Sequence, residues 1–208
     1  MNLIRNNFNT TEGLSVLDLG CGPRDQAVPL RHLGVNYVGV DYSNGDADML
    51  ADAHALPFAE ASFDVVLSYA VLEHLHNPFL AVSEVARILR PGGYYMGTVS
   101  QGEPFHSSYF HHTAWGVVSV VAAVSELELL RLWSARGTLD ALGKMAPYSR
   151  AIRLPLRMLG FAEANPALLS PTWKSATPEK RAEIKLMQAG SIGFCVRKKG
   201  TFSGRFRD

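Results

Sequence analysis

The sequence predicts an α/β protein built on a three-layer, doubly wound and mostly parallel sheet. From Leu14 to Ser100, short continuous apolar runs alternate with stretches of helical spacing. Continuous apolar runs are typical of parallel strands that are buried on both faces. Each run is followed by Gly, Asp, Asn or Ser, which are the residues that begin loops. Together these observations favour strands that alternate with covering helices.

Five strands are expected in the first part of the chain and two near its end. Their bounds are Ser15 to Leu19, Tyr37 to Val40, Met49 to Ala51, Phe63 to Ser68, Tyr94 to Val99, Leu127 to Trp133 and Ser191 to Arg197. The last two are expected to close the sheet as a hairpin at its edge.

Two helices can be placed from their spacing. Pro78 to Leu89 has apolar residues at intervals of three and four, with Asn77 as its N-cap and Pro91-Gly92-Gly93 as its stop. Trp115 to Val124 also favours a helix, although its many valines suit a strand as well. The stretch from Ser134 to Gly190 is too long for a hairpin turn and too apolar for a free linker, so we expect a helical insertion packed over the sheet.

Length and composition favour one domain over residues 1–208. The chain has 208 residues, 47% of them hydrophobic, and a net charge of +1, which gives no global field to attract nucleic acid or an anionic membrane. Its two cysteines, Cys21 and Cys195, have neither disulfide nor zinc spacing, which fits a reducing cytoplasm. No segment has the apolar length of a signal peptide or a membrane span, so we expect a cytoplasmic protein without stable membrane insertion.

The strongest chemical signal is an apolar strand that ends in Asp18 and opens into Gly20-Cys21-Gly22. Glycine permits a positive φ and lets a ligand lie against bare backbone. In open parallel sheets, ligand sites gather at the switch point beside the first strand. A glycine turn by itself is often only a tight loop.

Two further acids follow the next two strands. Asp41 is suited to accept hydrogen bonds from both hydroxyls of a ribose, and Asp52 from an exocyclic amine, with the amide of Ala53 beside it for a ring nitrogen. Taken singly, Asp41 also suits a helix N-cap, and Asp52 a solvated loop. Their order and spacing, each after its own strand, favour adenosine as the ligand.

The same residues resemble the successive motifs of class I S-adenosylmethionine-dependent methyltransferases, and most closely the branch that includes the ubiquinone and menaquinone biosynthesis methyltransferases. Six motifs occur in the order that this family shows. They are Leu17-Asp18-Leu19-Gly20-Cys21-Gly22-Pro23, Gly39-Val40-Asp41-Tyr42-Ser43, Ala51-Asp52-Ala53 with Leu56-Pro57-Phe58, Phe63-Asp64-Val65-Val66, Val71-Leu72-Glu73-His74 and Leu89-Arg90-Pro91-Gly92-Gly93.

The resemblance implies a seven-stranded sheet with its last strand antiparallel, and S-adenosylmethionine as the cofactor. It implies that Asp18 organises the turn and that Gly20, Cys21 and Gly22 lie beside the methionine portion of the cofactor. The adenosine would lie against Asp41, Tyr42, Asp52 and Ala53, and the methionyl group and acceptor pocket would lie beside Ser68 and Tyr69.

Two features depart from the family pattern. Only a short polar lead precedes Leu14, where most relatives carry helices that cover the cofactor, and Arg24 stands where many have glycine. We therefore expect the insertion from Ser134 to Gly190 to supply the cover. Within it, Arg150 to Leu159 mixes basic and apolar residues, which suits a packed and partly solvated helix, the wall of a lipophilic pocket or contact with a membrane surface.

His74 is the candidate catalytic base, because it follows the fourth strand and an imidazole titrates near neutrality. Packing or capping beside the next helix is the other interpretation. His106, His111 and His112 lack regular metal-ligand spacing, which favours a surface or pocket-lining loop over a metal site.

The predicted function is methyl transfer to a small molecule. A non-catalytic sensor or activating subunit that binds S-adenosylmethionine is the alternative. An NAD-dependent oxidoreductase is disfavoured because Asp25 stands where a dinucleotide fingerprint has its third glycine, and a carboxylate is a poor neighbour for pyrophosphate.

Overall fold

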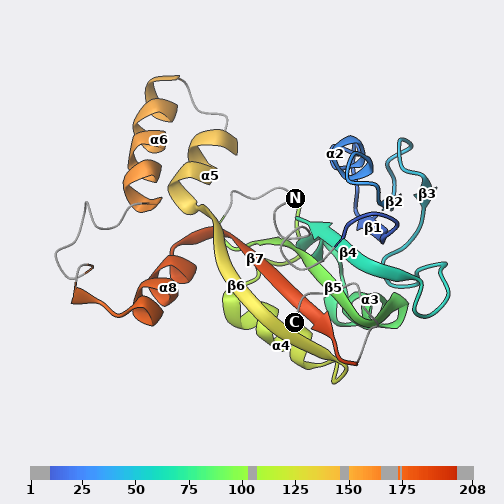
Figure 1. Cartoon of the computed structure of the whole chain (residues 1–208). Helices are drawn as coiled ribbons and strands as arrows, with labels where there is room; N and C mark the ends of the chain where they lie inside the picture. The colour runs from blue at the N-terminus through green and yellow to red at the C-terminus, as the bar shows by residue number, and fades with distance from the viewer. Residues whose placement is uncertain (1–9, 103–106, 146–149, 165–172, 174, 201–208) are drawn as a thin grey trace.

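The computed structural model of the chain describes residues 10–102, 107–145, 150–164, 173 and 175–200. Its strands form a seven-stranded sheet in the order β3-β2-β1-β4-β5-β7-β6 (Figure 1). Their bounds are β1 Ser15–Leu19, β2 Asn36–Asp41, β3 Met49–Leu50, β4 Phe63–Tyr69, β5 Leu89–Ser100, β6 Leu127–Gly137 and β7 Ala189–Lys198.

Strands β3, β2, β1, β4 and β5 are parallel neighbours, and β7 runs antiparallel between β5 and β6. The predicted sheet, with its antiparallel last strand and edge hairpin, is therefore confirmed. From β1 the chain adds β2 and β3 on one side and then β4 and β5 on the other side. The switch point therefore lies between β1 and β4. Ligands bind at such points in open α/β sheets.

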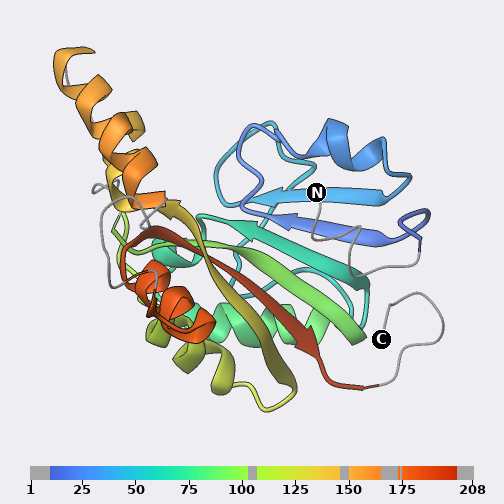
Figure 2. The same ribbon diagram turned by 60° about the vertical axis from the view of Figure 1, so that its left-hand side comes forward.

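Helices cover both faces of the sheet. Figure 2 shows α2 on one face and both α3 and α4 on the other, with an apolar core on each side. Thr113 caps α4, which confirms the expected helix beside Trp115. The helical bounds are α2 Ala27–Arg31, η1 Leu72–His74, α3 Pro78–Ile88, α4 Ala114–Ala122, α5 Thr138–Met145, α6 Arg150–Ala164 and α8 Pro178–Met187.

Strand β5 begins earlier than predicted. Helix α3 ends at Ile88, and Leu89 already pairs with Phe63 of β4, so Pro91-Gly92-Gly93 lies inside the strand rather than in a loop before it. The register shifts between Phe63 and Val65, and a bulge of this kind accommodates a proline. A Cβ added to Gly93 would lie 2.9 Å from the Asp64 carbonyl oxygen, so this approach requires glycine.

The stretch between β6 and β7, which was expected to be helical and packed over the sheet, contains α5, α6 and α8, and it is shorter than expected because β6 continues to Gly137 opposite Ala189. Helices α5 and α6 pack against each other and project from the end of the sheet (Figure 2). Among the described residues, no helix has both the length and the apolar character needed to cross a membrane.

We expect Gly97→Ala to lower the free energy of unfolding by about 1–3 kcal/mol, the usual cost of overpacking a core. An added Cβ at Gly97, in the middle of β5, would overlap the Ser68 carbonyl oxygen of β4, which is backbone and cannot easily move. Gly45→Ala is the control, since no heavy atom lies within 4 Å of its added Cβ. Equal stability of the two variants in urea titrations would contradict this close approach.

Candidate functional site

A cavity of about 470 Å³ opens where β1, β2 and β4 end. Its wall comes from the segments that follow four neighbouring strands, which is where a doubly wound sheet places a ligand. The lining residues are Leu19, Gly20, Asp41, Tyr42, Ser43, Ala51, Asp52, Ala53, His54, Ala70, Val71, His74, Leu75, His76 and Tyr109.

The turn after β1 presents bare backbone to this region. Gly20 has a φ of 68°, and an added Cβ would overlap the side chain of Val71, which follows β4. The N–H groups of Gly20 and Cys21 both donate to the Val40 carbonyl, at 2.8 and 3.0 Å. Gly22 has a φ of 49° and no heavy atom within 4 Å of an added Cβ. The turn therefore requires glycine and leaves open space above Gly22.

Asp41 joins the tip of β2 to this turn. Its Oδ2 accepts from the Gly22 N–H at 3.0 Å, and its Oδ1 accepts from the N–H groups of Ser43 and Asn44, both at 3.0 Å. Burial opposes its charge, but these backbone donors together hold the pKa of the carboxyl below its usual value. Asp41 is thus an ionised acceptor at the cavity, suited to the hydroxyls of a ribose.

Asp52 is positioned by a residue that the sequence analysis missed. Its Oδ1 accepts from the backbone N–H of His54 at 2.9 Å and from the His54 Nδ1 at 2.6 Å, which lowers the pKa of the carboxyl. The His54 Nε2 accepts from the Asn77 N–H at 3.3 Å, so the ring proton belongs on Nδ1. The ring also stacks on His76 at 4.1 Å between centroids. The only sequence signal for His54 was that it lies two residues after Asp52 in the chain.

The other predicted cofactor residues are not part of the cavity wall. Asp18 is buried and accepts from the Tyr37 hydroxyl at 2.8 Å. Burial raises the pKa of the Cys21 thiol to about 11, so it stays protonated. Ser68 is fully buried, and Tyr69 packs into the core on the α2 side. Together with Gly22, these residues are not part of the wall; after β4, Ala70 and Val71 form it instead.

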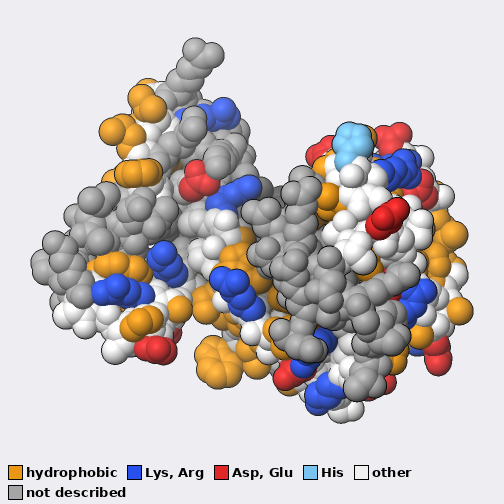
Figure 3. All heavy atoms as spheres, viewed as in Figure 1, with side chains coloured by type: hydrophobic (Ala, Val, Ile, Leu, Met, Phe, Trp, Pro, Cys, Tyr) orange, Lys and Arg blue, Asp and Glu red, His pale blue; other side chains and the backbone are white. Residues whose placement is uncertain are grey.

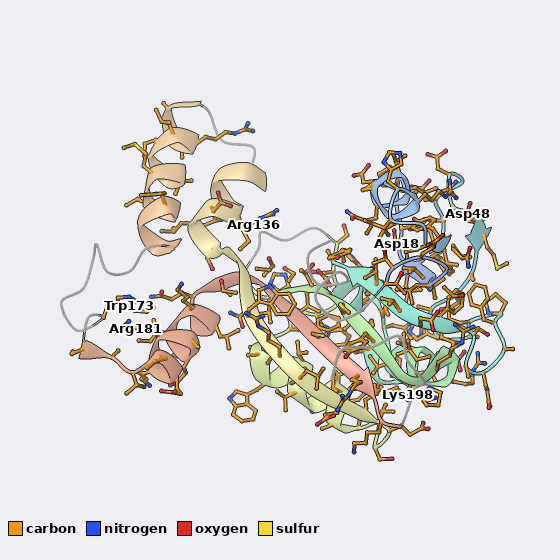
Figure 4. The ribbon with its side chains drawn as sticks, viewed as in Figure 1. Asp18, Asp48, Arg136, Trp173, Arg181 and Lys198 are labelled. Atoms are coloured by element: carbon orange, nitrogen blue, oxygen red, sulfur yellow. The ribbon has the colours of Figure 1, made fainter. Side chains whose placement is uncertain are left out.

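Arg24 adopts a backbone conformation that favours glycine. Its φ is 62°, in the left-handed region that side chains rarely adopt. Its guanidinium donates to Asp48 at 2.6 Å, and the other oxygen of Asp48 accepts from the Gly39 N–H at 2.9 Å. This ion pair fastens the turn to β2; Asp18 and Asp48 are labelled in Figure 4.

Glu73 positions the part of the cavity wall that contains His74 and Tyr109. Its buried Oε1 accepts from the Ser100 N–H at the end of β5, at 3.0 Å. Its carbonyl accepts from the N–H groups of Tyr109 and Phe110 at 2.8 and 3.1 Å. Glu73 thereby holds both His74 and Tyr109 at the cavity. Tyr109 was not among the predicted residues.

The other histidines of this region lie outside the wall. His111 is exposed, with its Nδ1 3.1 Å from the Gln101 carbonyl oxygen, and His112 is buried, which lowers its pKa. His106 lies outside the described residues. Within the described part of the chain, no group of three or more His, Cys, Asp or Glu side chains is arranged to hold a metal ion.

The insertion was expected to cover the cofactor site. No described residue between 134 and 190 belongs to the cavity wall. The sheet order explains this result. Strand β6 is the fourth neighbour from β1, and neighbouring strands are about 4.8 Å apart. The insertion therefore leaves the sheet far from the glycine turn.

Replacing Asp18 by Asn should change how stability depends on pH. Burial, opposed by the Tyr37 hydrogen bond, raises the pKa of Asp18 from its ordinary value of 3.8 to about 6 in the fold. Between those values the native state binds more protons than the unfolded state, so Asp18 costs stability as pH rises, on the order of 3 kcal/mol in total. Urea titrations at pH 4 and pH 7 should show Asp18→Asn gaining on the wild type at the higher pH. A constant difference would contradict the buried carboxyl.

Comparison with known proteins finds a family match over the segment that contains β2, β3 and β4. Residues 17–97 match the model of a family described as a methyltransferase domain. A relative named ubiquinone biosynthesis O-methyltransferase, from Maricaulis maris, is 36% identical over 98 residues, which cover 39% of this chain and 39% of that protein. The chain thus matches less than two fifths of the length of such curated relatives.

Solved structures extend the likeness in fold to most of the chain. An S-adenosylmethionine-dependent methyltransferase from Mesorhizobium loti superposes with a TM-score of 0.56 at 15% identity, covering 90% of this chain and 92% of that one. The [4+2]-cyclase SpnF superposes with a TM-score of 0.60 at 19% identity, covering 91% and 77%. Residues 17–97 therefore match a methyltransferase domain, and most of the chain has the fold that is found in S-adenosylmethionine-dependent methyltransferases.

Proposed function

We propose that this chain binds S-adenosylmethionine in the cavity at the ends of β1, β2 and β4 and transfers its methyl group to a small molecule. The observation that carries the proposal is the convergence of Gly20, Asp41 and Asp52 on one cavity from three separate strands. The relative named for ubiquinone biosynthesis supports a small-molecule acceptor.

The residues present fit this cofactor. The left-handed Gly20 and the open space above Gly22 suit the methionine portion, which needs close approach to backbone. Asp41 retains acceptor capacity for ribose hydroxyls, because each carboxylate oxygen accepts more than one hydrogen bond. Asp52, held by His54, would accept from the adenine amine beside Ala53.

When bound, the cofactor supplies a methyl group on a sulfonium, which is already an activated leaving group. The protein then has to orient the acceptor and exclude water, and such orientation supplies roughly 7–11 kcal/mol in favourable systems. Val71 and Tyr109 shape the wall that the acceptor would meet. His74, in the same wall, would take a proton from a hydroxyl or an acidic carbon as the acceptor is methylated.

Calorimetry tests the cofactor assignment directly. We expect S-adenosylmethionine and its demethylated product to bind, and NAD not to bind. Asp41→Ala and Asp52→Ala should each weaken binding by about tenfold or more, because each removes a hydrogen bond to a charged acceptor. Asp46→Ala is the control, since this acid is exposed on the same loop and outside the wall. Normal affinity in both cavity variants would exclude the proposed site.

Turnover tests the role of His74. With an acceptor found by screening quinols, sugars and small acids for methylated product, His74→Ala should lower the rate at least tenfold and leave cofactor affinity unchanged. His111→Ala is the matched control, because His111 lies outside the wall. Equal rates for the wild type and His74→Ala would remove His74 from the mechanism. Cofactor binding with no methylated product from any acceptor would instead favour a sensor or an activating subunit.

A further inference from the structure

His54 joins the cavity acid Asp52 to the start of helix α3. Its Nδ1 lies 2.6 Å from the Asp52 Oδ1, and its Nε2 accepts from the Asn77 N–H at 3.3 Å. Asn77 is the N-cap of α3. Because both ring nitrogens have partners, the imidazole cannot turn without losing two hydrogen bonds. The His54 side chain is 9% exposed and that of Asp52 is 48% exposed, so a fixed and mostly buried ring holds an accessible acid.

The two carboxylate oxygens of Asp52 differ in their partners. Oδ1 accepts from the His54 backbone N–H at 2.9 Å as well as from the ring. These two bonds hold the pKa of the carboxyl below its usual value. Among the described residues, no hydrogen bond is made to Oδ2. Oδ2 is therefore the oxygen of a charged carboxylate that can still accept a hydrogen bond and has none to donate.

The backbone beside Asp52 offers the complementary group. Ala53 lines the same cavity, and in the described part of the chain its N–H donates to no acceptor. A 6-aminopurine presents an amine hydrogen next to an unprotonated ring nitrogen, which matches an acceptor next to a donor. A 6-oxopurine presents the reverse pattern, a carbonyl oxygen next to a ring N–H. Its oxygen would face the carboxylate with no hydrogen between them.

The other cavity acid, Asp41, does not depend on a side chain in this way. It is held by the backbone N–H groups of Gly22, Ser43 and Asn44, which a side-chain substitution does not remove. Asp52 has one backbone donor and one ring donor. Loss of the ring would leave a half-exposed carboxylate with a single hydrogen bond, free to turn toward solvent.

We propose that His54 is a positioning residue that fixes Asp52 as an oriented acceptor and thereby restricts the cavity to nucleosides with a 6-aminopurine. His54 can act in this way only if the adenosine of the cofactor lies against Asp52, so this proposal rests on the proposed function. The competing explanation is a structural link to α3 through the Asn77 N–H. The two roles use different ring nitrogens, so substitutions can separate them.

Calorimetry on the full chain with two nucleosides tests the proposal and needs no turnover. S-adenosylhomocysteine carries the 6-amino group, and S-inosylhomocysteine carries a 6-oxo group in its place. We expect the wild type to bind the adenosyl compound at least about tenfold more tightly, because the inosyl compound leaves a charged acceptor unpaired. His54→Ala should reduce this preference to about threefold or less, mainly by weakening binding of the adenosyl compound.

The failure of this proposal can be told apart from the failure of the proposed function. If the wild type binds neither compound, both fail. If the wild type prefers the adenosyl compound and His54→Ala keeps the same preference, only the role of His54 is refuted. Equal binding of the two compounds by the wild type would refute it as well.

Two isosteric substitutions separate the ring nitrogens. His54→Asn places an amide nitrogen where Nδ1 lies, so it can donate to Asp52 and should restore the preference of the wild type. His54→Gln places an amide oxygen where Nε2 lies, so it can accept from the Asn77 N–H and should behave like His54→Ala. Restoration by Gln and not by Asn would assign His54 to the link with α3 and overturn the proposal.

A double-mutant cycle shows whether His54 acts through Asp52. In the Asp52→Ala background, adding His54→Ala should lower the affinity for S-adenosylhomocysteine by less than about twofold. Losses that add in full would contradict the proposal. His32→Ala is the matched control and should keep the wild-type preference, because His32 is exposed at the end of α2 and outside the cavity wall. Acidic and basic side chains are interspersed on the surface around α2 (Figure 3).

Discussion

The site depends on how the turn after β1 is held between its two neighbours. Its N–H groups at Gly20 and Cys21 converge on one carbonyl of β2, while the bare Cα of Gly20 lies against Val71 after β4. A side chain at Gly20 would push the tip of β1 away from the segment that follows β4, and the cavity lies between them. Glycine is required here by the close approach as well as by the positive φ.

The acidic residues around this turn have different roles because their surroundings differ. Asp41 and Asp52 border the cavity, and backbone N–H groups favour their charged forms, so both are ionised and oriented before a ligand arrives. Such preorganisation lowers the cost of ordering side chains on binding. Asp18 is buried below them, and burial disfavours its charge. The ionised carboxylates are thus suited to contact a ligand, whereas Asp18 supports the turn from within.

The sheet and the cavity acids were predictable because each strand is a continuous apolar run and each acid follows one directly. The local details were not, because they depend on residues that are distant in sequence. Arg24, which has a left-handed φ, pairs with Asp48, and Leu89 at the start of β5 pairs with Phe63. Tyr109 reaches the wall through the carbonyl of Glu73. No spacing pattern indicates partners of this kind.

The insertion was predicted as helical and as the cover of the cofactor site, but no described part of it lines the cavity, because the sheet order fixes where it leaves the fold. Strand β7 pairs with β6 as far as Gly137, so the insertion adds helices without interrupting the sheet. Residues 134–190 hold nine Lys and Arg against four Asp and Glu, a net charge of +5 in a chain of +1, so the remainder has a net charge of −4 and carries all of the cavity wall. The two parts meet at the edge of the sheet that is remote from β1, so Gly20, Asp41 and Asp52 are positioned without contacts from the described part of the insertion. A doubly wound sheet can therefore keep a cavity at the ends of its first strands while an insertion at its edge differs from it in composition and charge.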